Sequence, residues 1–263
     1  MFSDKEKEAK LRKAFLEISR GCSVAEYNDE LLYIKHFNIF DQERLDLAYQ
    51  RKLKKLQKQG ISSEADRLKE IEEEGKWGDK QKKQIAEKEV FIKNLQNTKK
   101  ALVIPAQKAQ IEEKLKKCEE EIAKLYAERD SLLNNTAEYF ANRYLNDISI
   151  YESFYKDETL NEHFFSQEEF EDLDRKEIYD LVKIYNTSFE NISIDVIKHL
   201  ALSGLFVNYF NINESDPSAL FSRPPLELTF YQVNLITYCK IFKSMFKNIP
   251  DINDETREDP DKL

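Results

Sequence analysis

The sequence predicts an all-α protein in which a long antiparallel helical hairpin of coiled-coil type is joined to a C-terminal helical bundle. Residues that make turns are scarce, with only 5 glycines and 6 prolines in 263 residues. Charged residues make up 35% of the chain, against about a quarter in an average protein. In the middle of the chain, apolar residues recur with a heptad period, which is the pattern of paired helices.

The heptad pattern occupies two neighbouring segments with a proline between them. Pro105 would disrupt the interior of a helix but suits the first turn, so it marks the start of the second helix. The simplest structure is two antiparallel helices that fold back at about residues 103–106. Only Arg129, at a d position, interrupts the second segment. The apolar positions are Ile85, Ile92, Leu95 and Leu102 in the first segment and Ile111, Leu115, Cys118, Ile122, Leu125 and Leu132 in the second.

The same pattern would also form between two copies of the chain. An intramolecular hairpin and a homodimeric coiled coil place the same residues in the seam. The sequence therefore leaves self-association through the hairpin open.

Short helical elements are expected before the hairpin. An amphipathic helix covers residues 4–20, and Ser23 and Glu26 have the spacing of a capping box that would open another helix. Residues 30–40 are rich in aromatic and aliphatic side chains, so they need a buried environment or a partner. A further helix covers residues 41–58.

After the hairpin, the chain is expected to form capped helices. The second hairpin helix is expected to continue to about Tyr155. Ser166 and Asp174 each begin a capping box. An apolar helix over residues 194–210 is predicted to be the central helix of the bundle, and Thr229 to cap a last helix.

These elements suggest four segments. Residues 1–78 hold the short N-terminal helices, and residues 79–150 hold the long hairpin. Residues 151–249 form the C-terminal bundle, and residues 250–263 form an acidic tail that is predicted to be disordered.

The net charge of −9 is concentrated in the C-terminal part. Residues 1–150 contain 30 Lys and Arg against 28 Asp and Glu, whereas residues 151–263 contain 11 against 22. Because an acidic surface repels phosphate groups, nucleic acid is not an expected partner. The lysines near the hairpin tip alternate with glutamates and are interpreted as a solvated helix face.

The chain has the features of a cytoplasmic protein. Its N-terminus has no apolar segment that would serve as a secretory signal. The apolar helix over residues 194–210 is shorter than the roughly 20 residues of a membrane span. Cys22, Cys118 and Cys239 are far apart in the sequence, so reduced thiols are expected.

No motif points to catalysis, and the chain is predicted not to be an enzyme. GxSxG and phosphate-binding glycine motifs are absent. None of His36, His163 and His199 has a glutamate three residues before it, as a di-iron site would require. No catalytic residue, cofactor or metal ion is therefore assigned. His163 is expected to be exposed. His199 could be a pH sensor or a general base, or else a hydrogen-bonded histidine of the core or its edge.

Four residues are candidates for contact with a partner protein. Trp77, the only tryptophan, lies between two glycines and could be an exposed anchor or could fill the base of the hairpin. Leu220, Phe221 and Arg223 lie in a proline-rich loop, where aromatic side chains beside arginine make good interface anchors. The alternative is that this loop packs onto the bundle.

Two stretches are similar to a known class of proteins. They are NNTAEYFANR (residues 134–143) and PPLELTFYQVNLITYCKIFKSMF (residues 224–246). With the proline-started hairpin helix, they resemble small acidic helical proteins encoded among the virion and tail-assembly genes of large tailed bacteriophages. The resemblance covers roughly residues 60–248 and implies no catalytic residue.

From the resemblance we expect a structural or assembly protein that acts by protein–protein interaction. It would be a virion, tail or baseplate component, or a tail assembly chaperone, located in the host cytoplasm or the virion. The alternative is an acidic regulatory binder that inhibits or modulates a host protein by charge mimicry. Other proteins are the expected partners, and no membrane is.

Overall fold

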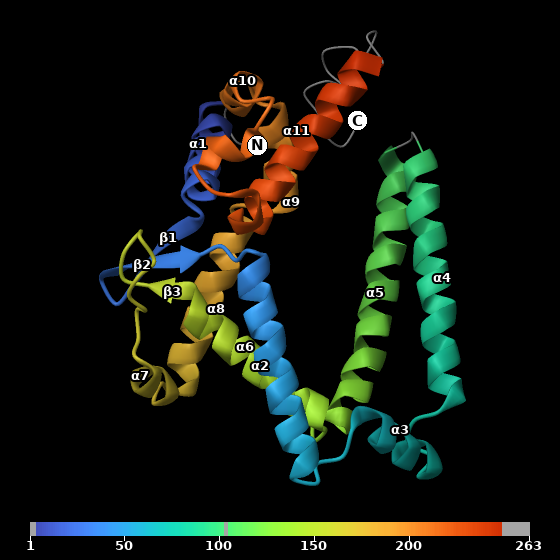
Figure 1. Cartoon of the computed structure of the whole chain (residues 1–263). Coiled ribbons are helices and arrows are strands. Elements are labelled where there is room, and N and C mark those ends of the chain that lie inside the picture. Colours follow the sequence, from blue (N-terminus) through green and yellow to red (C-terminus); the bar gives the residue numbers. More distant parts are fainter. Residues whose placement is uncertain (1–3, 103–104, 249–263) are drawn as a thin grey trace. The chain divides into compact units, whose positions relative to one another are not determined.

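The protein is helical, as predicted. The computed structural model describes residues 4–102 and 105–248, and 74% of the chain is helical, with one small sheet. The chain divides into two compact units, which we describe separately (Figure 1). Unit 1 comprises Met1–Leu47 and Asn146–Leu263, and unit 2 comprises Ala48–Leu145.

Unit 1 contains most of the elements. In chain order they are α1 (Asp4–Arg20), β1 (Cys22–Tyr27), β2 (Glu30–Lys35), β3 (Phe154–Tyr155), α7 (Gln167–Glu171), α8 (Arg175–Glu190), α9 (Ile194–Leu202), α10 (Gly204–Ile212), the 3₁₀ helices η1 (Pro217–Phe221) and η2 (Pro225–Glu227), and α11 (Phe230–Asn248). Unit 2 contains α3 (Glu64–Glu73), α4 (Asp79–Ala101) and α5 (Pro105–Leu133). Both unit boundaries fall within helices, in α2 (Ile39–Lys58) and α6 (Ala137–Ser153).

This division differs from the segments expected from the sequence. The first 47 residues belong with the C-terminal residues, because α1 packs against α9 and α11 of the bundle. The apolar residues of α1 complete a core that the C-terminal helices alone would leave open. The tail predicted over residues 250–263 lies outside the described residues.

A three-stranded antiparallel sheet replaces the helix expected after Gly21. Strands β1 and β2 pair from Cys22 with Lys35 to Tyr27 with Glu30, and β2 then pairs with β3. Asn28 and Asp29 make the turn with positive φ at both positions, which matches the twist of a two-residue hairpin. The expected capping box at Ser23 and Glu26 is therefore wrong.

The core of unit 1 has two parts. One is built mainly from α1, α9, α10 and α11 around fully buried Phe206, Leu200 and Leu235. The other lies between the sheet and helices α6 and α8, around Leu32, Phe154 and Leu181. From the aromatic-rich residues 30–40, Leu32 and Ile34 supply the sheet side of this core, whereas Leu31, Ile39 and Phe40 are exposed, so the predicted need for burial is met only in part.

The predicted central helix over residues 194–210 is broken in two. Ser203 leaves the helical conformation, with φ −71° and ψ 140°, and separates α9 from α10. Its hydroxyl donates to the Leu200 carbonyl at 2.7 Å, which satisfies an acceptor at the end of α9. The prediction of one continuous helix is wrong, although both halves carry core residues.

The predicted caps in the C-terminal part are confirmed. Ser166 and Asp174 form capping boxes with Glu169 and Glu177. The Thr229 hydroxyl accepts from the backbone N–H of Gln232 at 3.3 Å and begins α11.

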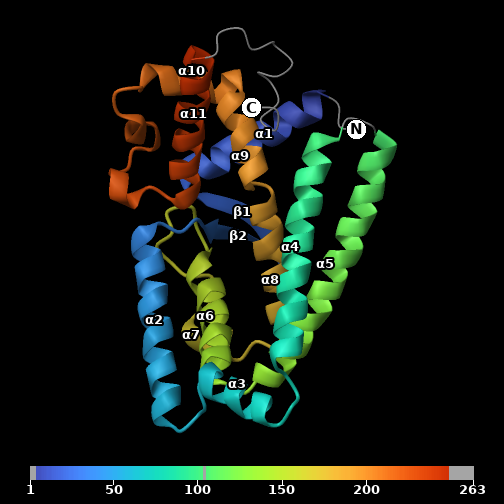
Figure 2. The same ribbon diagram turned by 90° about the vertical axis from the view of Figure 1, so that its right-hand side faces the viewer.

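In unit 2, the two seam segments pair with each other within one chain. Figures 1 and 2 show α4 and α5 side by side and antiparallel. Lys99 pairs with Glu112 at 2.9 Å, and the Tyr126 hydroxyl donates to Glu89 at 2.6 Å, which fixes the register. The predicted fold-back falls partly on residues 103–104, outside the described residues.

The second hairpin helix ends earlier than expected. Helix α5 stops at Leu133, and the Thr136 hydroxyl donates to the Leu133 carbonyl at 2.9 Å before α6 begins at Ala137. The backbone N–H of Ala137 donates to the Ser62 carbonyl at 2.9 Å. The chain therefore turns here instead of continuing to Tyr155 in one helix.

Arg129, the charged residue in the seam, has a specific partner. Its guanidinium forms an ion pair with Glu64, the first residue of α3. The Arg129 side chain is 31% exposed, so the charge keeps contact with water. No helix in the described part of the chain is long and apolar enough to cross a membrane.

Candidate functional site

Trp77 lies in the core of unit 2. It is 2% exposed and packs with Ile71 and Leu133, at the ends of α3 and α5. Of the two interpretations from the sequence, the structure favours the one in which this ring fills the base of the hairpin. A role for Trp77 in partner binding stays a prediction.

Leu220, Phe221 and Arg223 lie in unit 1, where η1 folds against the bundle. Phe221 is 6% exposed and belongs to the main core, and Leu220 is partly buried against it. Nη2 of Arg223 donates to the Arg20 carbonyl at 2.8 Å. Unit 1 thus brings these three residues together by packing, and their contact with a partner also stays a prediction.

The Arg223 guanidinium also covers Gly21. This glycine has φ +78°, and a Cβ at this position would lie 2.8 to 3.0 Å from the guanidinium atoms. Glycine is needed here for the backbone conformation, whereas the Arg223 guanidinium, at the end of a flexible side chain, could move away from a Cβ. The contact links the end of α1 to the loop after η1.

A buried chain of three polar side chains joins α1 to the sheet. The Ser23 hydroxyl donates to Glu17 at 2.9 Å and lies 2.9 Å from Nε2 of His36. All three residues are at most 5% exposed. Since the hydroxyl gives its hydrogen to Glu17, Nε2 of His36 must donate to Ser23. Nδ1 of His36 is then a buried acceptor that has no hydrogen-bond partner among the described residues.

This order of hydrogen bonds does not activate the serine. A nucleophilic serine donates to a histidine base, whereas Ser23 donates to a carboxylate. Burial, with a smaller contribution from Arg223, lowers the pKa of His36 to about 3, so its imidazole is neutral at pH 7. Burial also raises the pKa of Glu17, against the hydrogen bond from Ser23. We interpret the three residues as a structural network.

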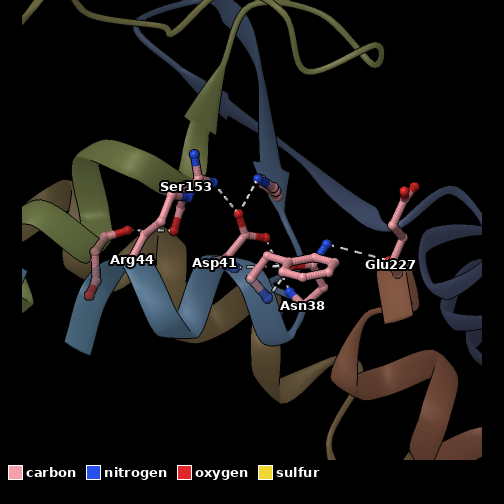
Figure 3. Close-up of polar contacts among 8 residues, drawn as sticks. Asn38, Asp41, Arg44, Ser153 and Glu227 are labelled. Carbon is pink, nitrogen blue, oxygen red and sulfur yellow. Dashed lines mark hydrogen bonds and ion pairs between the residues drawn. The ribbon is translucent and has the colours of Figure 1, made fainter. Parts of the chain in front are cut away.

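A second polar network surrounds Asp41 at the start of α2. Its carboxylate accepts from Lys35 at 2.6 Å, from the backbone N–H of Asn38 at 3.1 Å, and from Arg44. Figure 3 shows Asp41 between Arg44 and Asn38, with Glu227 beyond Asn38. Burial favours the protonated form, but the donors outweigh it and lower the pKa of Asp41. The carboxylate is therefore ionised and held in place at neutral pH.

A small cavity adjoins the Asp41 network. It has a volume of about 50 Å³ and is lined partly by Arg44 and Glu152. This is room for a few water molecules and much less than the roughly 300 Å³ of a typical ligand pocket. Burial, together with Glu152 and Asp41, raises the pKa of nearby Tyr155 to about 12, so its hydroxyl stays protonated.

The Asp41 network lies where two distant segments of unit 1 meet. Asn38 forms an isolated β-bridge with Thr229, and the backbone N–H of Phe230 donates to the Phe37 carbonyl at 3.1 Å. The Asn38 side chain accepts from the backbone N–H groups of Phe40 and Asp41, which caps α2. The starts of α2 and α11 are thereby joined.

Exposed apolar side chains gather around this junction. Each lies within four residues of Asn38 or Thr229 along the chain, and each is between 41% and 67% exposed. Solitary exposed apolar residues are common, whereas a contiguous exposed apolar patch marks an interaction site, so these side chains are a candidate contact surface. We call this group the junction patch; it consists of Ile39, Phe40, Leu226, Phe230 and Val233.

The other two histidines lie outside this junction. His163 is half-buried between the rings of Tyr151 and Tyr155, with centroid distances of 4.7 and 4.6 Å, so its predicted exposure is wrong. His199 is exposed on α9, and its Nδ1 lies 2.8 Å from the Asp195 carbonyl. This agrees with the interpretation of His199 as a hydrogen-bonded histidine at the edge of the core.

Unit 2 has a surface of its own along the hairpin. A groove of about 520 Å³ lies between α4 and α5. Phe91, which is 50% exposed, and Cys118 line its middle. Glu87 and Lys114 are among the charged side chains of the groove.

Within residues 4–102 and 105–248, no group of three or more His, Cys, Asp or Glu side chains could hold a metal ion. The three cysteines are free and buried. No family model matches the chain, and neither the curated proteins nor the solved structures contain a significant match.

Proposed function

We propose that this chain is a structural or assembly protein that binds another protein through the junction patch. The observation that supports it is the group of five exposed apolar side chains around the bridge between Asn38 and Thr229. Burying such side chains against a partner removes apolar surface from water, at about 25 cal/mol per Å². Two of them are phenylalanines, a residue type enriched in interfaces.

The elements below the patch are ordered before a partner arrives. Asn38 caps α2, Thr229 caps α11, and the Asp41 carboxylate joins β2 to α2 through Lys35. A surface that is already held in place loses less conformational entropy on binding than a disordered loop does. The junction therefore has the rigidity that a specific docking surface needs.

The resemblance to phage proteins suggests the kind of partner. Under this proposal the chain is a virion, tail or baseplate component, or a tail assembly chaperone. The patch would dock on another protein of the same assembly. The two roles differ in whether the chain stays in the finished particle.

The test is a pull-down of tagged full-length chain from its native source, read by mass spectrometry. We expect a variant with Phe40→Glu and Leu226→Glu to lose its main partner, because two charges would enter an apolar interface. The matched control is Ile212→Glu, which is 79% exposed on α10 and outside the patch, and it should keep the partner. Equal capture by the two variants would overturn the proposal.

Purified particles should be analysed in the same experiment. Presence in the particles and copurification with tail or baseplate proteins would support a structural component. Binding to assembly intermediates, with absence from the particles, would support a chaperone.

A second candidate function is an acidic regulatory binder. Unit 1 contains 19 Lys and Arg against 33 Asp and Glu, a net charge of −14. Such an acidic surface would favour a basic partner protein. It would compete with the acidic ligand that this partner normally binds. A host enzyme as the main hit, with binding that weakens steeply as salt is raised, would favour this function.

A further inference from the structure

The charged side chains of the hairpin groove are arranged so that the groove is complementary to a second copy of itself in the opposite direction. The pairs of Lys88 with Glu121 and of Lys99 with Glu112 set the register of α4 and α5, which places Phe91 and Cys118 at nearly the same level. Glu87 lies four residues from Phe91 toward the base of the hairpin. Lys114 lies four residues from Cys118 toward the tip. At 1.5 Å per residue, both charges are about 6 Å from the middle level, in opposite directions.

The other charged side chains of the groove fit this arrangement. Glu121 lies toward the base and is paired with Lys88, while Lys117 lies toward the tip and is paired with Glu113 outside the groove. Within the described part of the chain, Glu87 has only a weak pair, with Lys83 at 3.9 Å. Lys114 has no ion pair within residues 4–102 and 105–248. The base half therefore offers an available carboxylate and the tip half an available ammonium group.

The whole hairpin is polarised in the same sense. Residues 91–119, which form the tip half, contain 7 Lys and Arg against 3 Asp and Glu. Residues 79–90 and 120–133, which form the base half, contain 6 against 7. Two hairpins packed in the same direction would bring the basic tips together, whereas opposite directions place each tip beside a base.

We propose that this groove binds the groove of a second copy of the chain, with the two hairpins antiparallel. A two-fold axis would pass at the level of Phe91 and Cys118, so that both phenylalanine rings are covered and the base half of each hairpin faces the tip half of the other. Such an interface is isologous, the commonest kind in soluble homodimers. The seam stays within each chain, and the four helices form a bundle.

This surface is distinct from the junction patch, so the two proposals can fail separately. The dimer is tested on the purified full-length chain alone, by light scattering after size exclusion and by sedimentation equilibrium. We expect a dimer for the native sequence and a monomer for Phe91→Glu. The control Ile212→Glu, an exposed apolar residue of unit 1, should remain dimeric.

Charge exchange tests the direction of packing. Glu87→Lys places lysine opposite Lys114 of the second copy, and Lys114→Glu places glutamate opposite Glu87. Each variant alone should dimerise with a Kd raised about tenfold or more, because like charges meet twice in an isologous interface. An equimolar mixture should form a heterodimer of native affinity, since both contacts are then attractive, and this also shows that both variants are folded.

Two results would overturn the inference. One is a native chain that stays monomeric throughout the concentration range of sedimentation. The other is a dimer whose Kd is unchanged by Phe91→Glu and by both charge variants. Neither result bears on partner capture through the junction patch, which the pull-down measures with different substitutions.

Discussion

Unit 1 and unit 2 bury their apolar side chains in different ways. Unit 1 holds 24 of the 31 aromatic residues of the chain and encloses many of them in a core of several helices and a sheet. In unit 2, the hairpin has one seam, where Leu115 is 8% exposed while Ile122 and Leu125 are only partly buried. The comparison teaches that unit 1 is stabilised by a closed core, whereas the hairpin depends on a single seam that Ile71 and Trp77 support at its base.

The electrostatic contrast follows the same division. Unit 2 contains 22 Lys and Arg against 17 Asp and Glu, a net charge of +5, whereas unit 1 carries −14. All three histidines lie in unit 1, and the only tryptophan lies in unit 2. A stability change that depends on a histidine therefore arises in unit 1, whereas Trp77 fluorescence reports on unit 2.

The largest effect is expected from breaking the seam. Replacing Leu115, Ile122 and Leu125 with glutamine removes three apolar contacts, and a buried leucine truncated to alanine alone costs about 2 to 5 kcal/mol. Because the seam holds most of the apolar contacts between α4 and α5, these helices, with 23 and 29 residues, should lose their helicity. Circular dichroism would show this loss, and Trp77 emission would shift to the red.

The matched control for this variant uses the outer face of α5. Ala109, Lys116 and Ala123 are exposed and follow one another at intervals of seven residues. Their replacement by glutamine should leave helicity and Trp77 emission unchanged. Native helicity in the seam variant would show that the hairpin has support beyond its seam.

The predicted and observed folds agree best where contacts are local. The two hairpin helices were predictable because the heptads and Pro105 lie in one stretch of sequence, although the heptads left open whether the helices pair within one chain or between two copies. The sheet was missed because Ser23 and Glu26 have capping-box spacing. The two-residue turn at Asn28 and Asp29 between apolar runs was the signal that could have indicated strands.

The candidate site depends on contacts that sequence patterns do not specify. Asn38 and Thr229 are joined by a β-bridge although 191 positions separate them in the sequence. Leu226 and Phe230 form part of the junction patch because the bridge brings their segment to the one that carries Ile39 and Phe40. Sequence patterns do not predict this bridge. The candidates predicted from the sequence, Leu220 and Phe221, lie in the loop before Leu226. Phe221 is buried in the core, and Leu220 packs against it.

The next largest effect is expected from a fall in pH, which should lower the stability of unit 1 and leave that of unit 2 unchanged. The pKa of His36 is about 3 in the folded chain and about 6.5 when unfolded, so the unfolded chain binds the proton more tightly. Stability is therefore lost as the pH falls below about 6.5, and the loss reaches about 2 kcal/mol at pH 5. Urea unfolding of unit 1, followed by tyrosine near-ultraviolet circular dichroism at pH 7 and pH 5, measures it.

The neighbours of His36 define the controls. Glu17, whose raised pKa makes it take up a proton as the pH falls, offsets part of the loss, and Glu17→Gln should make the full loss visible. His36→Gln keeps a donor toward Ser23 without titrating, so its stability should no longer fall between pH 7 and pH 5. Trp77 fluorescence should show that the stability of unit 2 toward urea is the same at pH 7 and pH 5. An equal loss of stability in unit 2 would mean that the two units do not unfold independently.

The smallest effect is expected from the exposed ion pair of Lys99 and Glu112 on the hairpin. Their side chains are 42% and 55% exposed, whereas the Asp41 carboxylate of unit 1 is 5% exposed and has three donors. Water and salt screen an exposed pair, so Glu112→Gln should cost the hairpin less than about 0.5 kcal/mol. Urea unfolding followed by Trp77 fluorescence would measure this difference at low salt, and it should vanish at about 1 M salt, where the screening length is about 3 Å. A larger cost that persists in salt would mean that this pair stabilises the hairpin as strongly as a contact of the seam does.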